Sequence, residues 1–431
     1  MCSCRRAFAR KHFLRVPVDN DVNLRRNASL AAFALTVGAC AASTAPPTTS
    51  VPTVAPTTPV LPDNEPPDAS EVSPAILDVK PGIPDVDQSL HSVPLEDVYF
   101  DTFDGGSVQL SRSTLEVRRR LFDAIRPIDN PPYGDVTAGD WLADDDLVIG
   151  FVTEKQAYAY PIKILNFHEI VNDEFNGVPI LISYCPLCFS GVVYDRRVDG
   201  NTLTFSNTSA LYESDLVMVD RETGSYWWQV AGESIVGTLT GSRLTSLPSV
   251  TTTWSEWALE YPDTLIMTRD VGPVPERYTR DPFVGYAENI DNGFFIFPVG
   301  EAGQDPRLTP ATLVIGVELG GVARAYPIEF LGLAATSDIV GGVATVLFTT
   351  GDGTTGAVFS AVLEDGTELT FSGSGSDFVD DQTGSTWNVF GRALSGPLVG
   401  TTLIPLPSRS TFWFAYVGAF PDAEVFSRPR S

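Results

Sequence analysis

The sequence contains one series of short motifs twice, and this internal duplication limits what the chain can fold into more than any other feature. Residues 147–150 (LVIG) recur as residues 313–316, and residues 159–162 (AYPI) recur at the same spacing as residues 325–328. Further pairs follow in the same order: GNTLTF at 200 with GTELTF at 366, TGS at 223 and 383, and LPS at 247 and 406. Order and spacing kept over a domain-length stretch indicate a tandem duplication of one structural unit.

Each copy consists mostly of predicted strands. β-branched or aromatic runs, separated by Gly, Asn and Asp, are typical of strands joined by tight turns; in the first copy they lie at 147–152, 178–184, 191–194 and 203–205. Short helices are expected after Tyr160-Pro161 and over 253–261. Because no long helices alternate with the strands, the predicted fold class is mainly β (β-rich α+β), with two tandem degenerate repeats of a sandwich- or barrel-like unit.

Composition and the duplication together divide the chain into five parts. These are a leader (1–40), a Pro/Thr/Ser-rich disordered tether (41–74), an entry segment (75–140), the first repeat (141–270), and a linker with the degenerate second repeat (271–431). The tether has too few apolar residues to form a core. The formal net charge of -26 argues against nucleic acid and anionic membrane surfaces as partners.

The leader has the pattern of an export signal. A basic pair at 25–26 precedes an apolar stretch at 28–37, and small residues at 38–39 precede Cys40. This arrangement is similar to a bacterial lipobox, in which the cysteine is lipidated; the alternative is an ordinary signal peptide with an incidental cysteine. We therefore expect an exported protein, anchored to the cell membrane through lipid on Cys40 and facing the extracytoplasmic side. The anchor is the one membrane contact predicted, and neither a protein partner nor a small-molecule substrate is identified.

The duplication also separates residues that serve the fold from candidates for function. Asp220, Thr223, Gly224 and Trp227 recur in the second copy, which assigns them to turns and core. Reactive residues of the first copy face other residues in the second: His168 faces Ala334, Cys185 faces Thr350, Cys188 faces Gly353, and Arg221 faces Asp381. This loss marks His168, Cys185, Cys188 and Arg221 as functional candidates.

The pair Cys185-Pro-Leu-Cys188 has three possible roles: a structural disulfide, a redox couple, or two metal ligands. A disulfide that closes so small a loop contributes little stability. A thioredoxin-like site requires a helix after the motif, whereas the sequence predicts a strand at 191–194. If His168 approaches the cysteines, two thiolates and an imidazole form a site suited to copper or zinc. Glu169 can complete or orient this site, or act as a general base, and Glu169 and Arg221 are the candidate catalytic residues.

These motifs in this order resemble a bacterial and archaeal family catalogued only as a domain of unknown function. The resemblance covers about residues 95–430 and is carried by HEIVND at 168–173, YCPLC at 184–188, Gly191, DLV at 215–217, and DR and TGS within 220–225. It implies exported, often lipid-anchored proteins with a Cys-Pro-x-Cys signature and no established reaction. One departure is Phe167, where the family commonly has Trp.

Two hypotheses about function follow. In the first, an extracytoplasmic lipoprotein uses Cys185, Cys188 and His168 to bind copper or zinc, or to carry out thiol redox chemistry. In the alternative, the protein is a non-catalytic surface or assembly module stabilised by a Cys185–Cys188 disulfide. The sequence leaves open whether the protein is an enzyme.

Overall fold

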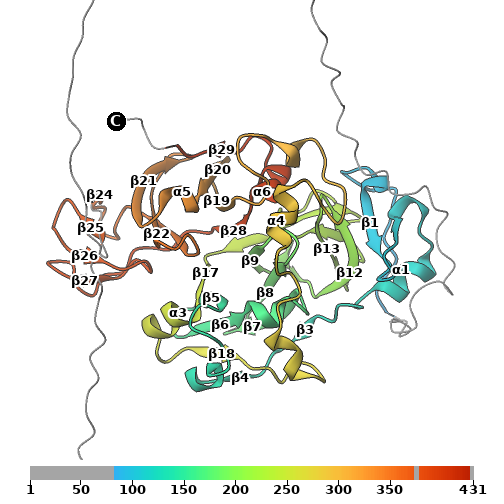
Figure 1. Cartoon of the computed structure of the whole chain (residues 1–431), viewed down its shortest axis with the longest axis horizontal. Helices are drawn as coiled ribbons and strands as arrows, with labels where there is room; N and C mark the ends of the chain where they lie inside the picture. Colours follow the sequence, from blue (N-terminus) through green and yellow to red (C-terminus); the bar gives the residue numbers. More distant parts are fainter. Residues whose placement is uncertain (1–81, 373–377, 428–431) are drawn as a thin grey trace, which may run out of the picture. The chain divides into compact units, whose positions relative to one another are not determined.

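The computed structural model describes residues 82–372 and 378–427, all of which belong to one compact unit of the chain. The expected leader and tether, including Cys40, lie outside the described residues. The described part is mainly β with short helices, which confirms the predicted fold class, and none of its sheets closes into a barrel (Figure 1). None of the helices in this part of the chain is both long and apolar enough to cross a membrane.

The first repeat and the entry segment before it form three groups of strands. A five-stranded sheet has the order β17-β5-β6-β18-β4, and its strands are β4 (Tyr133–Gly134), β5 (Leu147–Val152), β6 (Ala157–Pro161), β17 (Val250–Thr253) and β18 (Leu265–Met267). A six-stranded sheet has the order β15-β14-β13-β12-β1-β2, and its strands are β1 (Val98–Asp101), β2 (Ser107–Gln109), β12 (Phe205–Tyr212), β13 (Asp215–Asp220), β14 (Tyr226–Trp228) and β15 (Glu233–Val236). The third group comprises β3 (Ile128–Asp129), β7 (Ile170–Phe175), β8 (Val178–Cys185), β9 (Ser190–Asp195) and β16 (Thr245–Leu247). A separate small hairpin pairs β10 (Arg197–Val198) with β11 (Asn201–Thr202).

The second repeat follows the same order of elements. Its strands are β19 (Leu313–Leu319), β20 (Val322–Pro327), β21 (Ala334–Val340), β22 (Val343–Thr349), β23 (Gly356–Ser360), β24 (Phe371–Ser372), β25 (Phe378–Asp380), β26 (Thr386–Trp387), β27 (Ala393–Ser395), β28 (Arg409–Phe412) and β29 (Glu424–Val425). The antiparallel pairing of β17 with β5 recurs as β28 with β19. The parallel pairing of β18 with β6 recurs as β29 with β20. The matching sequence motifs therefore correspond to matching strand pairs.

Short helices occupy equivalent places in the two repeats. Helix α2 (Ile162–Leu165) corresponds in chain order to α5 (Ile328–Leu331), and α3 (Trp254–Glu260) corresponds to α6 (Trp413–Ala419). The remaining helices are α1 (Leu115–Leu121) in the entry segment and α4 (Tyr286–Asp291) in the linker. Single 3-10 turns lie at Leu95–Asp97, Leu110–Arg112, Val136–Gly139, Pro275–Thr279 and Ala302–Gln304.

The residues kept in both copies hold equivalent turns together. The Trp227 indole Nε1 donates to Asp220 at 2.9 Å, and the Trp387 Nε1 donates to Asp380 at 3.0 Å. Both tryptophans are fully buried. Since a buried indole N–H requires an acceptor, the structure supports the interpretation that these shared residues serve the fold.

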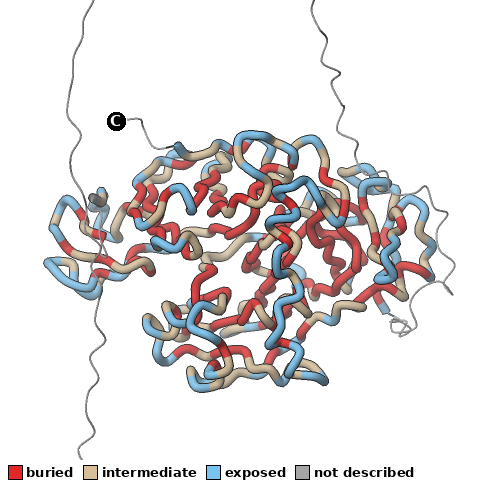
Figure 2. The backbone as a smooth tube through the Cα atoms, viewed as in Figure 1, coloured by how far each residue is buried: buried red, intermediate tan, exposed pale blue. Residues whose placement is uncertain are grey.

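Strands of the two repeats contact each other in both directions. Strand β28 of the second repeat lies beside β9 of the first, where Ser410 pairs with Gly191, so the third strand group continues as β29-β20-β19-β28-β9-β8-β7-β3 (Figure 1). In the reciprocal direction, Thr355 Oγ1 before β23 donates to Thr252 Oγ1 on β17 at 3.0 Å. Figure 2 shows buried backbone where the two repeats meet. Each repeat thus completes its core against the other.

Candidate metal centre

The two cysteines lie at the end of a β-hairpin. Cys185 is the last residue of β8 and pairs with Ser190, the first residue of β9. The loop turns back through Phe189, whose φ of 54° is in the left-handed region that few side chains adopt. A strand, not a helix, follows Cys188, as the sequence predicts. The hairpin therefore presents two sulfur atoms without the helix dipole that activates a thioredoxin-like thiol.

Asp215, the first residue of β13, completes a group of three ligand atoms. The Cys188 Sγ lies 2.9 Å from Asp215 Oδ1. The two sulfurs and a carboxylate oxygen of Asp215 all lie within 4.8 Å of one another. Both cysteines are free thiols, and exposures are 2% for Cys185 and 0% for Cys188 and Asp215. Three soft or charged ligand atoms meet in the interior of the protein.

A set of hydrogen bonds holds Asp215 and Cys188 in place. The backbone N–H of Val230 donates to Asp215 Oδ2 at 2.8 Å. On the other side, Cys188 Sγ lies 3.1 Å from Ser190 Oγ, and that hydroxyl donates to Gln229 Oε1. Gln229 Nε2 in turn donates to the Ser190 carbonyl at 3.2 Å. Such a surrounding network fixes the orientation of candidate ligands.

Burial sets the protonation of the group. It raises the pKa of both Cys185 and Cys188, and the Asp215 carboxylate raises them further. Burial also raises the pKa of Asp215 to about 6, although the hydrogen bond from Cys188 acts in the opposite direction. Without a cation, the thiols are therefore kept protonated and are weak nucleophiles, because the thiolate is the reactive form.

His168, the expected third ligand, is not in this group of ligand atoms, and its ring nitrogens contact other residues. The ring Nδ1 lies 2.6 Å from the Arg126 carbonyl, and Nε2 lies 2.7 Å from the Tyr278 hydroxyl. Both ring nitrogens thus have partners, and Asp215 takes the place expected for His168 beside the cysteines. Burial lowers the pKa of His168, which favours a neutral imidazole held by these two contacts.

Glu169 lies near the cysteines, whereas Arg221 belongs to a different group. Glu169 is buried and has a φ of 59°, and Asn207 Nδ2 donates to its Oε2 at 2.7 Å. Burial raises the pKa of Glu169 to about 8, and the charge of Asp215 contributes to this rise. Arg221 instead pairs with Asp129 at 2.7 Å and donates to Ser206 Oγ at 2.8 Å. Of the two candidate catalytic residues, Glu169 is the one electrostatically coupled to the cluster.

The second repeat supplies one wall of this centre. The backbone N–H of Phe412 and the hydroxyl of Thr411 both donate to the Cys188 carbonyl, at 2.8 and 3.1 Å. Phe412 and Phe414 pack in the same hydrophobic cluster as both cysteines. On the outer side of the hairpin, a cavity of about 460 Å³ is lined by residues that include Pro186. Residues 411–414 of the second copy therefore help to enclose the cysteine hairpin of the first.

The internal duplication also singles out Asp215. The offset that aligns Val219-Asp220 with Val379-Asp380 places Asp215 opposite Gly375, and it places Gln229 opposite Val389. Both polar residues of the site are thus absent from the second copy. A single carboxylate among 54 acidic residues stands out only through this comparison.

Comparisons with curated proteins and with solved structures return no match. A protein family does match residues 122–423, well over half of the chain. The matched region includes the Cys-Pro-Leu-Cys hairpin, Asp215 and nearly all of the second repeat. The chain therefore belongs to the family described as "Protein of unknown function (DUF3179)".

Proposed function

We propose that the first repeat binds a zinc ion through Cys185, Cys188 and Asp215. The observation that carries this proposal is the convergence of two sulfurs and a carboxylate oxygen within 4.8 Å in a buried site. Ligand distances of roughly 2.0–2.3 Å around zinc require only small side-chain shifts from this arrangement. A bound cation replaces the thiol protons, so the hydrogen bond between Cys188 and Asp215 gives way to coordination of both groups.

Metal binding accounts for these residues better than thiol exchange does. A redox dithiol has to meet a partner thiol or disulfide, whereas both sulfurs are buried. Their raised pKa values disfavour the nucleophilic thiolate. A divalent cation reverses this disadvantage because it stabilises thiolate and carboxylate together.

The third ligand favours zinc over copper(I). Copper(I) is selected by soft thiolate and thioether ligands, whereas zinc accepts sulfur and carboxylate oxygen together. Three protein ligands leave a fourth position, which is the pattern of a catalytic zinc site when water or substrate occupies it. Glu169 is close enough to Asp215 to respond to its charge, and it can occupy that position or exchange a proton with a group bound there.

The cellular setting belongs to the same proposal. The lipobox-like sequence before Cys40 supports an exported protein anchored by lipid on the extracytoplasmic side. A preformed metal centre is a means of stabilising such a domain outside the cell, and it also allows metal-dependent chemistry. A surface or assembly module with a Cys185–Cys188 disulfide stays the alternative, and the two hypotheses predict opposite oxidation states of the cysteines.

Elemental analysis combined with a thiol count separates these hypotheses. The full chain, purified without chelators and supplied with one equivalent of zinc, is expected to retain about one ion per chain. Under denaturing conditions with a chelator, both Cys185 and Cys188 are expected to react as free thiols. The variants C185S and C188S are expected to lose the ion.

Two outcomes contradict the proposal. One is a chain that lacks zinc and yields no reactive thiol from Cys185 or Cys188, as a disulfide requires. The other is full retention of zinc in C185S and C188S. Trp227→Phe is the control for a general effect on folding. It removes the buried hydrogen bond from Trp227 to Asp220 and leaves all proposed ligands in place.

A further inference from the structure

The two repeats meet at two junctions in equivalent places, and the residues that these junctions contain differ. At one junction, β19 and β28 of the second repeat face β9 of the first; at the other, β5 and β17 of the first repeat face β23 of the second. The strand registers match, because Arg409 pairs with Gly316 as Val250 pairs with Gly150. The two junctions therefore allow a position-by-position comparison within one molecule.

At the first junction, an ion pair fills the space between the repeats. Arg409 is 6% exposed, pairs with Glu318, and donates to the Val230 carbonyl beside Tyr194. A buried guanidinium is stable only when such partners satisfy it. The filled junction also supports the metal centre, since the N–H of Val230 binds Asp215.

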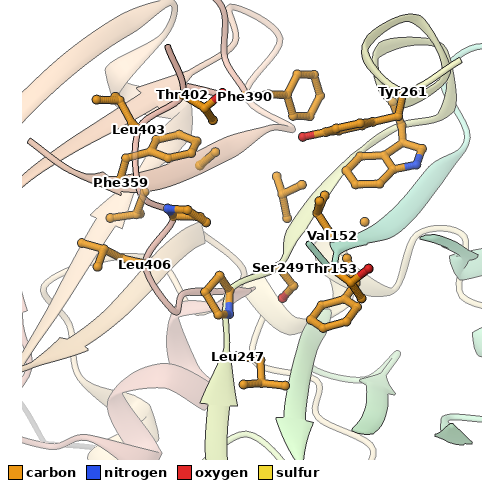
Figure 3. A pocket seen from close by; sticks show the side chains of 18 residues that line it. Val152, Thr153, Leu247, Ser249, Tyr261, Phe359, Phe390, Thr402, Leu403 and Leu406 are labelled. Carbon is orange, nitrogen blue, oxygen red and sulfur yellow. The ribbon is translucent and has the colours of Figure 1, made fainter. Parts of the chain in front are cut away.

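At the second junction, the same two positions carry valines, and a cavity of about 470 Å³ is present. Val152 stands where the second repeat has Glu318, and Val250 stands where it has Arg409. Both valines line the cavity. Phe359, at the position equivalent to Tyr194, lies across the cavity from Val152 (Figure 3). The first junction has an equivalent arrangement of strands and is filled by side chains. The strand arrangement alone therefore does not require a cavity at the second junction.

The walls of the cavity define what it can accept. None of the described residues that line it is an Asp, Glu, Lys, Arg or His, in a chain with a net charge of -26. Aromatic rings come from both repeats: Trp257 and Tyr261 from the first, and Phe359 and Phe390 from the second. The Phe390 ring lies beside Tyr261 (Figure 3), with 5.8 Å between their centroids. A charged ligand would lose hydration here without gaining a partner, whereas an apolar ring can pack against these aromatic side chains. The volume lies within the range of roughly 300–1,000 Å³ that small-molecule sites occupy.

We propose that the second junction is a binding site for an uncharged, ring-bearing apolar small molecule. The site is independent of the metal centre, and the two proposals can fail separately. Its ligand inserts between β5 and β17 of the first repeat and β23 of the second, where Val152 and Val250 replace the ion pair of the other junction. Val152 is 47% exposed and lies at the mouth of the cavity.

Binding of N-phenyl-1-naphthylamine, an uncharged aromatic dye that fluoresces in apolar surroundings, tests this site. The full chain is expected to bind one dye saturably. The double variant V152E/V250R copies the ion pair of the first junction into the second and is expected to weaken binding at least about tenfold, a difference of about 1.4 kcal/mol. Val399→Glu, at a residue that is 63% exposed and outside the cavity, is expected to bind the dye as the unmodified chain does.

Leu403→Trp provides a second test that adds volume without charge, because Leu403 is buried in the cavity wall. It is expected to weaken dye binding while zinc content and circular dichroism stay those of the unmodified chain. If the double variant does not fold, L403W decides the result alone. Unchanged dye affinity in whichever of these variants fold, or a lack of saturable binding to the unmodified chain, overturns the proposal. Stronger competition by decanol than by naphthalene contradicts the preference for a ring.

Discussion

At the scale of single residues, Asp173 shows how burial makes stability depend on pH. The Tyr160 hydroxyl donates to Asp173 Oδ2 at 3.0 Å, and the Tyr133 hydroxyl donates to the same oxygen. Burial nevertheless raises the pKa of this carboxyl, with the Tyr133 hydrogen bond acting in the opposite direction. Folding therefore favours the protonated form. The stability that this group contributes is present below its unfolded pKa of roughly 3.9 and is lost as pH rises through the folded value.

The variant D173N is expected to remove this dependence. Relative to the unmodified chain, its free energy of unfolding should rise between pH 4 and pH 7, because the amide cannot ionise. Asp365→Asn is the opposed control: the backbone N–H of Thr367 lowers the pKa of Asp365, so this variant should lose a little stability over the same interval. Urea titrations at both pH values measure the two differences. If the free energy of unfolding of D173N, relative to that of the unmodified chain, falls as pH rises, the raised pKa assigned to Asp173 is wrong.

The residues of the centre were only partly predictable from the sequence. Cys185 and Cys188 were identified by their spacing and by their loss from the second copy, and both lie in the cluster. His168 carries the same sequence signal, yet its ring binds Arg126 and Tyr278. A residue that the second copy lacks can thus make a structural contact found only in the first copy. The sequence alone does not distinguish such a residue from a metal ligand. Asp215 lies beside the cysteines because two different sheets, one with β13 and one with β8 and β9, pack against each other in a shared hydrophobic cluster.

At the scale of elements, both repeats pack an aromatic side chain of a helix directly on a glycine of the first strand. A Cβ at Gly150 would lie 2.1 Å from the ring of Trp257, and a Cβ at Gly316 would lie 2.1 Å from the ring of Tyr416. Both rings are buried, so neither can move aside freely. This shared contact explains why α3 and α6 lie on equivalent strands.

Alanine at either glycine is therefore expected to destabilise the protein by about 1–3 kcal/mol through overpacking. Chemical denaturation of G150A and G316A measures the effect. Gly351→Ala is the matched control, because its added Cβ would come no closer than 3.6 Å to any neighbour and should change stability little. Equal stability of all three variants contradicts the packing described for the helices.

The strands and short helices of each repeat were predictable because alternating apolar residues and turn residues are local signals. The partner of each strand was not. The contact of β28 with β9 joins segments more than 200 residues apart, and it depends on how the two copies pack. The cavity at the second junction and the contact of Phe412 with the cysteine hairpin both follow from this packing.

At the scale of the whole molecule, the proposed export would determine which metals and ligands the protein encounters. If the sequence before Cys40 is a lipoprotein signal, the mature chain should begin at a lipidated Cys40. Mass spectrometry of protein extracted from membranes is expected to show the modified residue, and Cys40→Ser is expected to release the chain from the membrane. An unmodified N terminus at another residue would exclude the lipid anchor.

The most direct test of the proposed metal centre compares zinc affinity in D215N and H168Q by competition with a chelator. Loss of a direct ligand should weaken zinc binding at least about 100-fold, since changes to residues that only orient a ligand already cost about 10–100-fold. We predict that D215N shows this loss, and that H168Q, whose site lies beside Arg126 and Tyr278, binds zinc as the unmodified chain does. Full affinity in D215N together with a loss in H168Q would contradict the centre described here.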